Sequence, residues 1–236
     1  FSTQIPIISL TKNWYEVTAK EARIELRGHQ LLAGETRIDL EPTLLDQLNL
    51  SEKDQAYLRG DHGQAAKAAM ETICIMGAVE NASELVSVER GHIDGCILAN
   101  DANLIFAEKM VQLGARTTIP TTINAISVDR EHWQHSGLAS DFGKRASRLA
   151  DAYVTMGVKP TFTCAPYLLS DKPQFGEKIG WSESNAVIFA NTVLGAQTQK
   201  HPDYLDLFIA MTGIAPAVGV YSTAGRQASL RIAVQI

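Results

Sequence analysis

The sequence contains no apolar segment that approaches the ~18 residues needed to cross a bilayer, and none with the layout of a signal peptide. It also lacks runs of Lys or Arg, and its formal net charge of -5 provides no basic patch for nucleic acid. These absences argue against membrane and nucleic-acid partners. We therefore expect a cytoplasmic protein that acts on small molecules.

Cysteine is scarce, and the three residues Cys74, Cys96 and Cys164 form no CxxC pair. An odd count argues against a disulfide framework. Cys74 and Cys96 are typical of small buried hydrophobic residues, whereas Cys164 lies in a polar loop. Cys164 could be a packed thiol, a nucleophile with His92 as its base, or a metal ligand whose partner ligands lie outside this chain.

Several motifs of common enzyme classes are missing. The sequence has no GxGxxG after a strand, no GxxxxGK[ST], no GxSxG and no HExxH. Dinucleotide-binding, P-loop, α/β-hydrolase and zincin functions therefore lose their usual support.

The chain does contain a repeated order of strand, polar loop and helix. With 236 residues, 45% hydrophobic and 20% charged, it has the composition of an ordinary globular protein. Repeated alternation predicts an α/β domain with a largely parallel sheet. The predicted strand–helix pairs are 85–88 with 101–113, 116–119 with 141–156, and 159–163 with 182–195. Further helices are expected at 51–60, capped by Ser51, and at 63–79, while Asp101 should cap the helix that follows it.

The two ends of the sequence suggest a piece of a longer chain. Short strands are expected at 5–10 and 22–26, and alternating apolar residues predict a half-buried strand at 230–236. Neither end carries a polar tail. We expect a domain boundary near residue 40 and a cut at both ends.

Polar side chains gather where the predicted strands end. In parallel sheets, ligands bind beyond the carboxyl ends of the strands, so the three loops there can converge on one site. Their polar residues are His92 with Asp94, then Thr121, Thr122 and Asn124, then Cys164 and Tyr167, and the next helix opens with Glu183, Ser184 and Asn185. The same residues also have explanations that involve no function. The loops could be solvated turns or the closed end of a strand, and the residues at the helix start could be a helix cap. Asn185 and Asn191 lie six residues apart, on different faces of a helix, so only one can point straight into a common pocket.

Taken together, these strings resemble the aconitase X family, the diverged relatives of aconitase. The matching runs cover roughly residues 44 to 236 in the family's order. They are Leu58-Arg59-Gly60-Asp61-His62-Gly63, His92-Ile93-Asp94-Gly95-Cys96, Pro120-Thr121-Thr122-Ile123-Asn124, Thr163-Cys164-Ala165-Pro166-Tyr167, Glu183-Ser184-Asn185-Ala186 with Ala190-Asn191, and Gly195-Ala196-Gln197-Thr198.

The resemblance implies an aconitase-like layered domain with mostly parallel sheets and flanking helices. The family pairs a small swivelling domain with a large catalytic domain. Residues 1–40 then resemble the C-terminal part of the small domain with its linker, and 41–236 the N-terminal part of the large domain. A fused chain of this type implies cis-3-hydroxy-L-proline dehydratase activity, with 1-pyrroline-2-carboxylate as the product. The two-subunit archaeal relatives, which dehydrate mevalonate 5-phosphate, are the alternative.

The resemblance also implies roles for individual residues. An iron centre, either an iron–sulfur cluster of the 2Fe-2S type or a mononuclear iron, would act as Lewis acid on the leaving hydroxyl, with Cys164 as one ligand. The implied catalytic residues are His92, Glu183 and Ser184, and the implied substrate-binding residues are Thr121, Thr122, Asn124, Tyr167, Asn185 and Asn191. Further ligands and the serine base would come from the remainder of the small and large domains.

The chain departs from the family pattern at two positions. Gln197 and Ile214 stand where many members have arginine, and this leaves the identity of the acidic substrate open. Two other functions remain as alternatives: a cysteine-nucleophile enzyme that uses Cys164 and His92, and a non-catalytic aconitase-like module that binds a small acid without metal.

Overall fold

The computed structural model describes residues 24–27, 30–33, 36–39, 48–94, 97–228, 230 and 232–233. The predicted strand at 5–10 and Cys96 lie outside these residues.

The predicted strand at 230–236 is wrong where it can be checked, because Leu230 and Ile232 lie outside any strand and are each 74% exposed. An alternating pattern gives a half-buried strand only when a neighbour covers one face.

A small antiparallel sheet precedes the main body of the chain. It consists of β1 (Ile24–Arg27), β2 (Gln30–Ala33) and β3 (Thr36–Asp39) in that order. The first strand confirms the predicted strand at 22–26 to within two residues.

The first two helices form as the sequence predicts. Ser51 caps α2 (Glu52–Arg59), and its side chain and that of Asp54 each bond the other's backbone N–H in a capping box. Gly60 ends the helix with φ +89°. The following helix, α3 (Gln64–Val79), buries an almost entirely apolar face that includes Met70.

Two further helices, α4 (Asp101–Gln112) and α5 (Ser140–Thr155), pack against each other. Both were expected, but the cap of α4 is Asn100 rather than Asp101. The Asn100 side chain accepts from the Ala102 N–H at 2.9 Å, so the cap lies one residue earlier than predicted. No helix in the described ranges combines the length and the apolar character that a membrane crossing requires.

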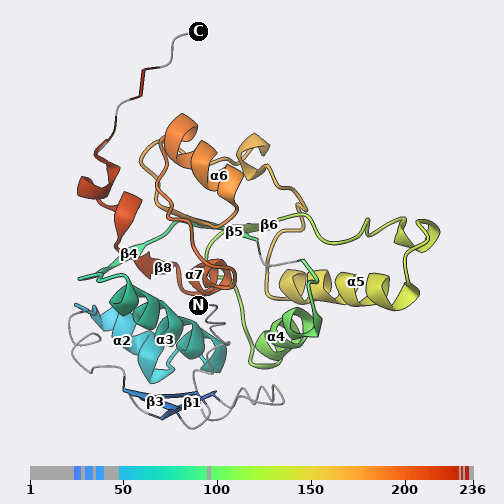
Figure 1. The fold of residues 1–236 in the computed structure, drawn as a ribbon, viewed down its shortest axis with the longest axis horizontal. Helices are drawn as coiled ribbons and strands as arrows, with labels where there is room; N and C mark the ends of the chain where they lie inside the picture. The colour runs from blue at the N-terminus through green and yellow to red at the C-terminus, as the bar shows by residue number, and fades with distance from the viewer. Residues whose placement is uncertain are drawn as a thin grey trace.

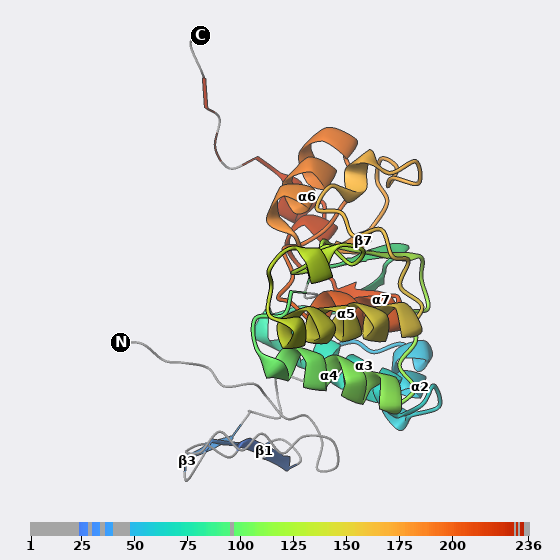
Figure 2. The same ribbon diagram turned by 90° about the vertical axis from the view of Figure 1, so that its right-hand side faces the viewer.

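The strands form two more sheets. A parallel sheet has the order β6 (Thr121–Ile123), β5 (Arg90–Ile93), β7 (Ile179–Trp181), and β4 (Leu85–Ser87) pairs antiparallel with β8 (Ile214–Pro216). The α/β class is confirmed, and within the described strands the parallel pairing is confined to the central sheet. Figures 1 and 2 show helices on both sides of that sheet.

Three strand predictions need correction. Residues 116–119 are not a strand, because the strand lies four to five positions later, at β6. Residues 159–163 make only one parallel bridge, from Lys159 to Thr122. The strand β7 was not predicted, because its three residues, Ile179, Gly180 and Trp181, are too short a run to show a period.

The core of the molecule is organised around α7 (Leu205–Thr212), all eight residues of which are buried. The helix lies between α3 and the parallel sheet (Figure 1). Gly91 and Gly180, which are register partners in β5 and β7, make this approach possible. A Cβ on Gly180 would lie 2.6 Å from Cγ2 of Ile209, and one on Gly91 would lie 3.2 Å from Cβ of Ala210. The sheet therefore carries glycine where the helix crosses it.

The opposite side of the sheet is covered by α6 (Ser184–Phe189), which continues into a π-helical turn, η3 (Ala190–Leu194). Figure 2 shows α6 above the sheet and α3 and α4 below it. The short 3₁₀ helix η2 (Pro166–Leu168) packs beside α6, and the ring of Tyr167 stacks on that of Phe189 with centroids 4.1 Å apart. The predicted helix at 182–195 is confirmed, with its start at Ser184.

Candidate active site

His92 stands in the middle of the central strand β5 and is fully buried. The sequence placed it in a loop, and this prediction is wrong, because Gly91–Ile93 pairs with β6 and His92 also pairs with Trp181 of β7. Its Nδ1 lies 2.7 Å from Oγ1 of Thr122, the register partner in β6. The imidazole is thus held by the sheet itself rather than by a mobile connection.

The other ring nitrogen faces a carboxylate. Nε2 of His92 lies 3.8 Å from Oε2 of Glu183, and both atoms are buried without a hydrogen-bond partner in the part of the chain that the structure describes. Burial lowers the pKa of His92 to about 4, so the imidazole is neutral at neutral pH. The geometry fits a tautomer in which Thr122 donates to Nδ1 and Nε2–H points at Glu183.

Glu183 is the residue on which the neighbouring groups converge. Burial raises the pKa of its carboxyl group and the nearby charge of Asp94 raises it further, whereas hydrogen bonds to Cys164 and Asn124 lower it. A carboxyl group in this setting holds a proton more readily than an exposed glutamate does. A carboxyl group whose pKa is shifted by its surroundings is a candidate for proton transfer.

Asp94 and Asn124 directly follow β5 and β6, and they form the floor of the cluster, meaning the side next to the carboxyl ends of these strands. Nδ2 of Asn124 donates to Oδ1 of Asp94 at 2.6 Å, and Oδ1 of Asn124 accepts from the Ala125 N–H at 2.6 Å. The backbone N–H of Asn124 also donates to the Ile93 carbonyl at 2.9 Å, which continues the strand pairing into the site. The predicted convergence of the loops is therefore observed for these residues.

Cys164 lies at the exposed edge of the same cluster. Partial desolvation raises the pKa of its thiol, a hydrogen bond from Ala125 lowers it, and the Glu183 and Asp94 carboxylates raise it. A nucleophilic cysteine needs a lowered pKa and a base, yet here the thiol pKa is raised and His92 faces Thr122 and Glu183. This geometry does not favour the cysteine-nucleophile alternative. Asn185 donates from Nδ2 to the Cys164 carbonyl at 2.9 Å and so fixes the loop.

Four of the predicted site residues do not join the cluster. Thr121 is buried and donates to the Ile119 carbonyl at 2.8 Å, and Tyr167 stacks on a ring of α6. Ser184 is exposed at the start of α6. Asn191 donates to the carbonyls of Val187 and Thr198, so it ties η3 to the following segment. Only Asn185 of the two amides reaches the cluster, as the six-residue spacing predicted.

One residue of the site escaped the sequence analysis. Asp206 belongs to α7, is fully buried, and accepts from the Asp94 N–H with Oδ2 at 2.7 Å. The signal that could have found it is a single acidic residue in the otherwise uncharged helix Leu205–Thr212. A charged group in a fully apolar helix is costly unless it has partners.

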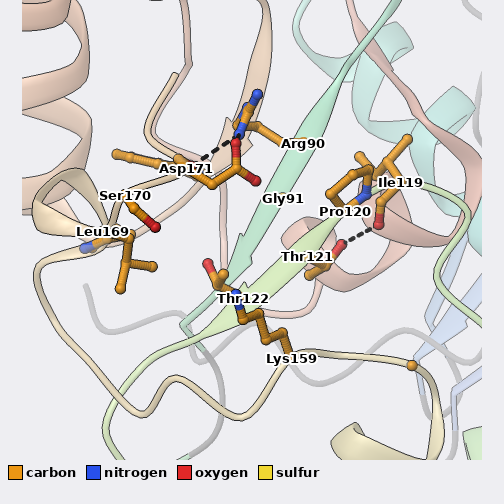
Figure 3. Close-up of a pocket in the computed structure, with 13 residues that line it drawn as sticks. Arg90, Gly91, Ile119, Pro120, Thr121, Thr122, Lys159, Leu169, Ser170 and Asp171 are labelled. Atoms are coloured by element: carbon orange, nitrogen blue, oxygen red, sulfur yellow. Dashed lines mark hydrogen bonds and ion pairs between the residues drawn. The ribbon is translucent and has the colours of Figure 1, made fainter. Parts of the chain in front are cut away.

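A separate pocket of about 230 Å³ opens beside β5 and β6 (Figure 3). Its wall includes Arg90, which pairs with Asp171 at 2.9 Å and also with Glu177. The positive charge of Arg90 is thus already balanced by two carboxylates. Thr122 reaches the pocket wall as well, but the ring that it holds, His92, is fully buried. The cluster around Glu183 is therefore the candidate site that we consider further.

Comparison with known proteins identifies the family. A family model described as the aconitase X first domain matches residues 47–224. The chain belongs to the aconitase X family. The domain boundary near residue 40 stays a prediction.

Two relatives are 50% identical to this chain over about four fifths of its length. They are the cis-3-hydroxy-L-proline dehydratases of Hypocrea jecorina, 50% identical over 191 residues (81% of this chain, 32% of the relative), and of Pseudomonas aeruginosa, 50% identical over 182 residues (77% and 31%). The phosphomevalonate dehydratase large subunit of Methanothermobacter thermautotrophicus is 31% identical over 188 residues (79% and 47%). The chain spans about a third of the length of the first two relatives.

A solved structure agrees with the family assignment. The crystal structure of the holo-form of aconitase X from Thermococcus kodakaraensis matches with a TM-score of 0.70 and 30% identity, over 76% of this chain and 45% of that one. The aconitase X fold is therefore shared across most of the chain.

The cluster contains one side chain that could serve as an iron ligand. Cys164 offers an exposed thiol, and the two adjacent carboxylates that raise its pKa would favour a bound cation. Within the ranges that the structure covers, no three His, Cys, Asp or Glu side chains lie close enough to hold a metal ion. Any metal bound at Cys164 would need further ligands.

Proposed function

We propose that this chain is part of an iron-dependent hydro-lyase that removes water from cis-3-hydroxy-L-proline and yields 1-pyrroline-2-carboxylate. The observation that carries the proposal is the difference in identity. The chain is 50% identical to two cis-3-hydroxy-L-proline dehydratases but 31% identical to a phosphomevalonate dehydratase large subunit.

The charge of the cluster supports the same substrate. Two carboxylates, Asp94 and Glu183, face the site, while Lys200 is the cation whose charge acts on Glu183. The secondary ammonium group of hydroxyproline would be attracted to this acidic environment, whereas a phosphate dianion would be repelled. Ile214, which replaces a common family arginine, is 3% exposed in the core of β8 and supplies no positive charge.

The reaction requires loss of the proton at Cα and of the hydroxyl at C3, with the bonding electrons of the C–H bond forming the double bond. The resulting enamine tautomerises to the cyclic imine. Bound iron would supply Lewis acidity to the leaving hydroxyl, and Cys164 would hold it. Glu183 is suited to hold or release a proton at Oε2, because its pKa is raised and that oxygen is unpartnered.

The remaining residues would bind and orient. His92, neutral and held by Thr122 at Nδ1, would present its Nε2–H 3.8 Å from Oε2 of Glu183, which is too far for a direct hydrogen bond but close enough for the N–H dipole to orient that carboxyl group. Asn124 and Asp94 would contact the amino acid from the floor. Asn185 would hold the Cys164 loop, with Ser184 and Tyr167 at the rim. Thr121 and Asn191 would act only as supports of the surrounding structure.

The proposal implies a partner region. Because the chain spans about a third of the hydroxyproline dehydratases that it matches, the remaining iron ligands and a base on the other face of the substrate would come from the rest of the protein. The small hydroxy acid and this region are the two expected partners.

A substrate comparison in the full-length protein tests the proposal. The protein would be purified anaerobically, analysed for iron and sulfide, and assayed with cis-3-hydroxy-L-proline and with mevalonate 5-phosphate. We expect turnover of the first substrate alone. Turnover of the second alone would transfer the protein to the other branch of the family, and absence of iron would favour a binding module.

A matched pair of variants tests the role of Glu183. Glu183→Gln should lower kcat by about 10²–10⁴-fold, as expected for loss of a proton-transfer group. Glu80→Gln is the control, because the pKa of Glu80 is also raised by burial and its Oε2 is also unpartnered, yet it lies at the end of α3. Equal effects of the two substitutions would refute the role.

A further inference from the structure

Asp206 is a fully buried carboxylate at the start of the core helix α7. Its two oxygens accept hydrogen bonds from backbone amides of two different elements. Oδ1 accepts from the Leu207 N–H at 2.7 Å, within its own helix, and Oδ2 accepts from the Asp94 N–H at 2.7 Å, where the chain leaves β5. A buried carboxylate is tolerated only with such partners. It therefore fastens the end of the central strand to the helix that crosses the sheet.

The bond to Asp94 continues into the candidate site. The carboxylate of Asp94 accepts from Asn124 at 2.6 Å, and the Asn124 amide in turn interacts with Glu183. Oδ1 of Asn124 accepts from the Ala125 N–H at 2.6 Å, and this same N–H interacts with the Cys164 thiol. A continuous set of hydrogen bonds thus leads from the core helix to the two residues at the centre of the proposed chemistry.

We propose that Asp206 is a positioning residue, whose carboxylate fixes the backbone at Asp94 and thereby sets where Asp94 and Asn124 meet Glu183 and Cys164. Asparagine has the same shape but carries one acceptor oxygen and one NH₂ group. In Asp206→Asn, a donor would face either the Asp94 N–H or the Leu207 N–H, and that backbone would have to move. The consequence for the reaction rests on the proposed function, but the consequence for the backbone does not.

A matched control is available on the same helix. Thr212 is also buried in α7, and its Oγ1 donates to the Phe208 carbonyl at 3.0 Å and accepts from the Ile214 N–H at 3.2 Å. Thr212→Val removes these bonds without a change of size, at the end of α7 that leads into β8. Both variants remove polar partners in the core, so a merely structural role predicts similar effects.

The experiment uses the full-length protein with two readouts. Hydrogen exchange, followed by mass spectrometry of the peptide that contains Asp94, should be at least about tenfold faster in Asp206→Asn than in wild type, because its amide loses a buried acceptor. Steady-state kinetics with cis-3-hydroxy-L-proline should show kcat reduced by about 10- to 100-fold, since small displacements of catalytic groups are costly. KM should change less than about threefold, and Thr212→Val should leave exchange at Asp94 and kcat near wild type.

Each outcome of this experiment either supports or overturns the positioning role of Asp206. Faster exchange together with lower kcat in Asp206→Asn alone supports the proposal, whereas effects no larger than those of Thr212→Val overturn it. Faster exchange with unchanged kcat also overturns it, because the backbone would then move without consequence for the reaction. If wild type does not turn over hydroxyproline, the proposed function fails and hydrogen exchange alone decides whether Asp206 holds Asp94. If Asp206→Asn does not fold, Asp206→Ser is measured instead, since the shorter side chain also cannot reach the Asp94 amide.

Discussion

Titration of His92 provides the most direct test of the candidate site. Burial lowers the pKa of this imidazole from 6.5 to about 4. The difference corresponds to roughly 3 kcal/mol between its charged and neutral forms. At pH 5.5, about 3% of such a ring would be protonated, compared with about 90% of an ordinary histidine. His92 should therefore stay largely neutral from pH 8 down to about pH 5.

The ring signals of histidine report this directly. Full-length protein labelled with ¹⁵N at histidine would be titrated from pH 8 to pH 5, with His92→Gln to assign the signals and urea-unfolded protein as the reference. We expect the His92 nitrogens to keep the shifts of a neutral tautomer protonated at Nε2. A midpoint near 6.5 would refute the claim that burial keeps the ring neutral. The assignment of the ring proton to Nε2, which faces Oε2 of Glu183 at 3.8 Å, would then have to be revised.

The same pKa has a defined effect on stability. The unfolded chain takes up a proton near pH 6.5 and the folded chain only near 4, so the contribution of His92 is full above about 6.5 and is lost as pH falls through about 4. His201, also lowered to about 4 by burial, acts in the same direction. Asp206, raised by burial to about 7 from 3.8, acts in the opposite direction, and its contribution is lost as pH rises through about 7. Because these effects offset one another, the ring signals are a cleaner measurement than a melting curve.

Three further substitutions have expected outcomes. Cys164→Ser should remove bound iron and activity from the full-length protein. Cys74→Ser is the control and should retain both, because Cys74 is a buried thiol whose pKa is raised to about 12. Metal analysis distinguishes the two variants, and retained iron in Cys164→Ser would contradict the ligand role. Gly180→Ala should destabilise the protein by about 1–3 kcal/mol, because the new Cβ would lie 2.6 Å from Cγ2 of Ile209; an unchanged melting temperature would show that α7 can shift freely. Ser51→Ala should cost about 1 kcal/mol through loss of the α2 cap, measured by denaturant unfolding, while Ser51→Asp should largely restore it.

The helices could be predicted from the sequence because their signals are local. The cap at Ser51 and the glycine at Gly60 mark the bounds of α2 within the sequence itself. The strands were harder, and the stretch around β6 explains why. Thr117-Thr118-Ile119 and Thr121-Thr122-Ile123 are identical triplets on either side of Pro120, so propensity cannot choose between them. Pairing with β5 selects the second triplet, and pairing is a long-range property.

The candidate site was predictable in outline and not in detail. Polar residues after successive strands indicated the right edge of the sheet, and His92, Asn124, Cys164 and Glu183 do meet there. The roles of Thr121 and Asn191 could not be read from the sequence, because the same side chains bind a ligand or a nearby carbonyl according to their rotamer. Asp206 was missed because its partner Asp94 is 112 residues away in the chain.

The placement of His92 within the central strand bears on how substrate preference could be altered in this scaffold. The neighbours of the imidazole are strand residues, whereas the rim, meaning the exposed edge of the cluster, is formed by the connection at Cys164 and by Asn185 in the first turn of α6. Substitutions in those connections can reshape the mouth of the site while the ring keeps its place, since backbone pairing on both sides fixes it. A library of variants with substitutions confined to the rim should therefore contain proteins with new hydroxy-acid preferences and an unchanged titration of His92. The rim is then the part of the site that can evolve, and the strand around His92 is the part that stays fixed.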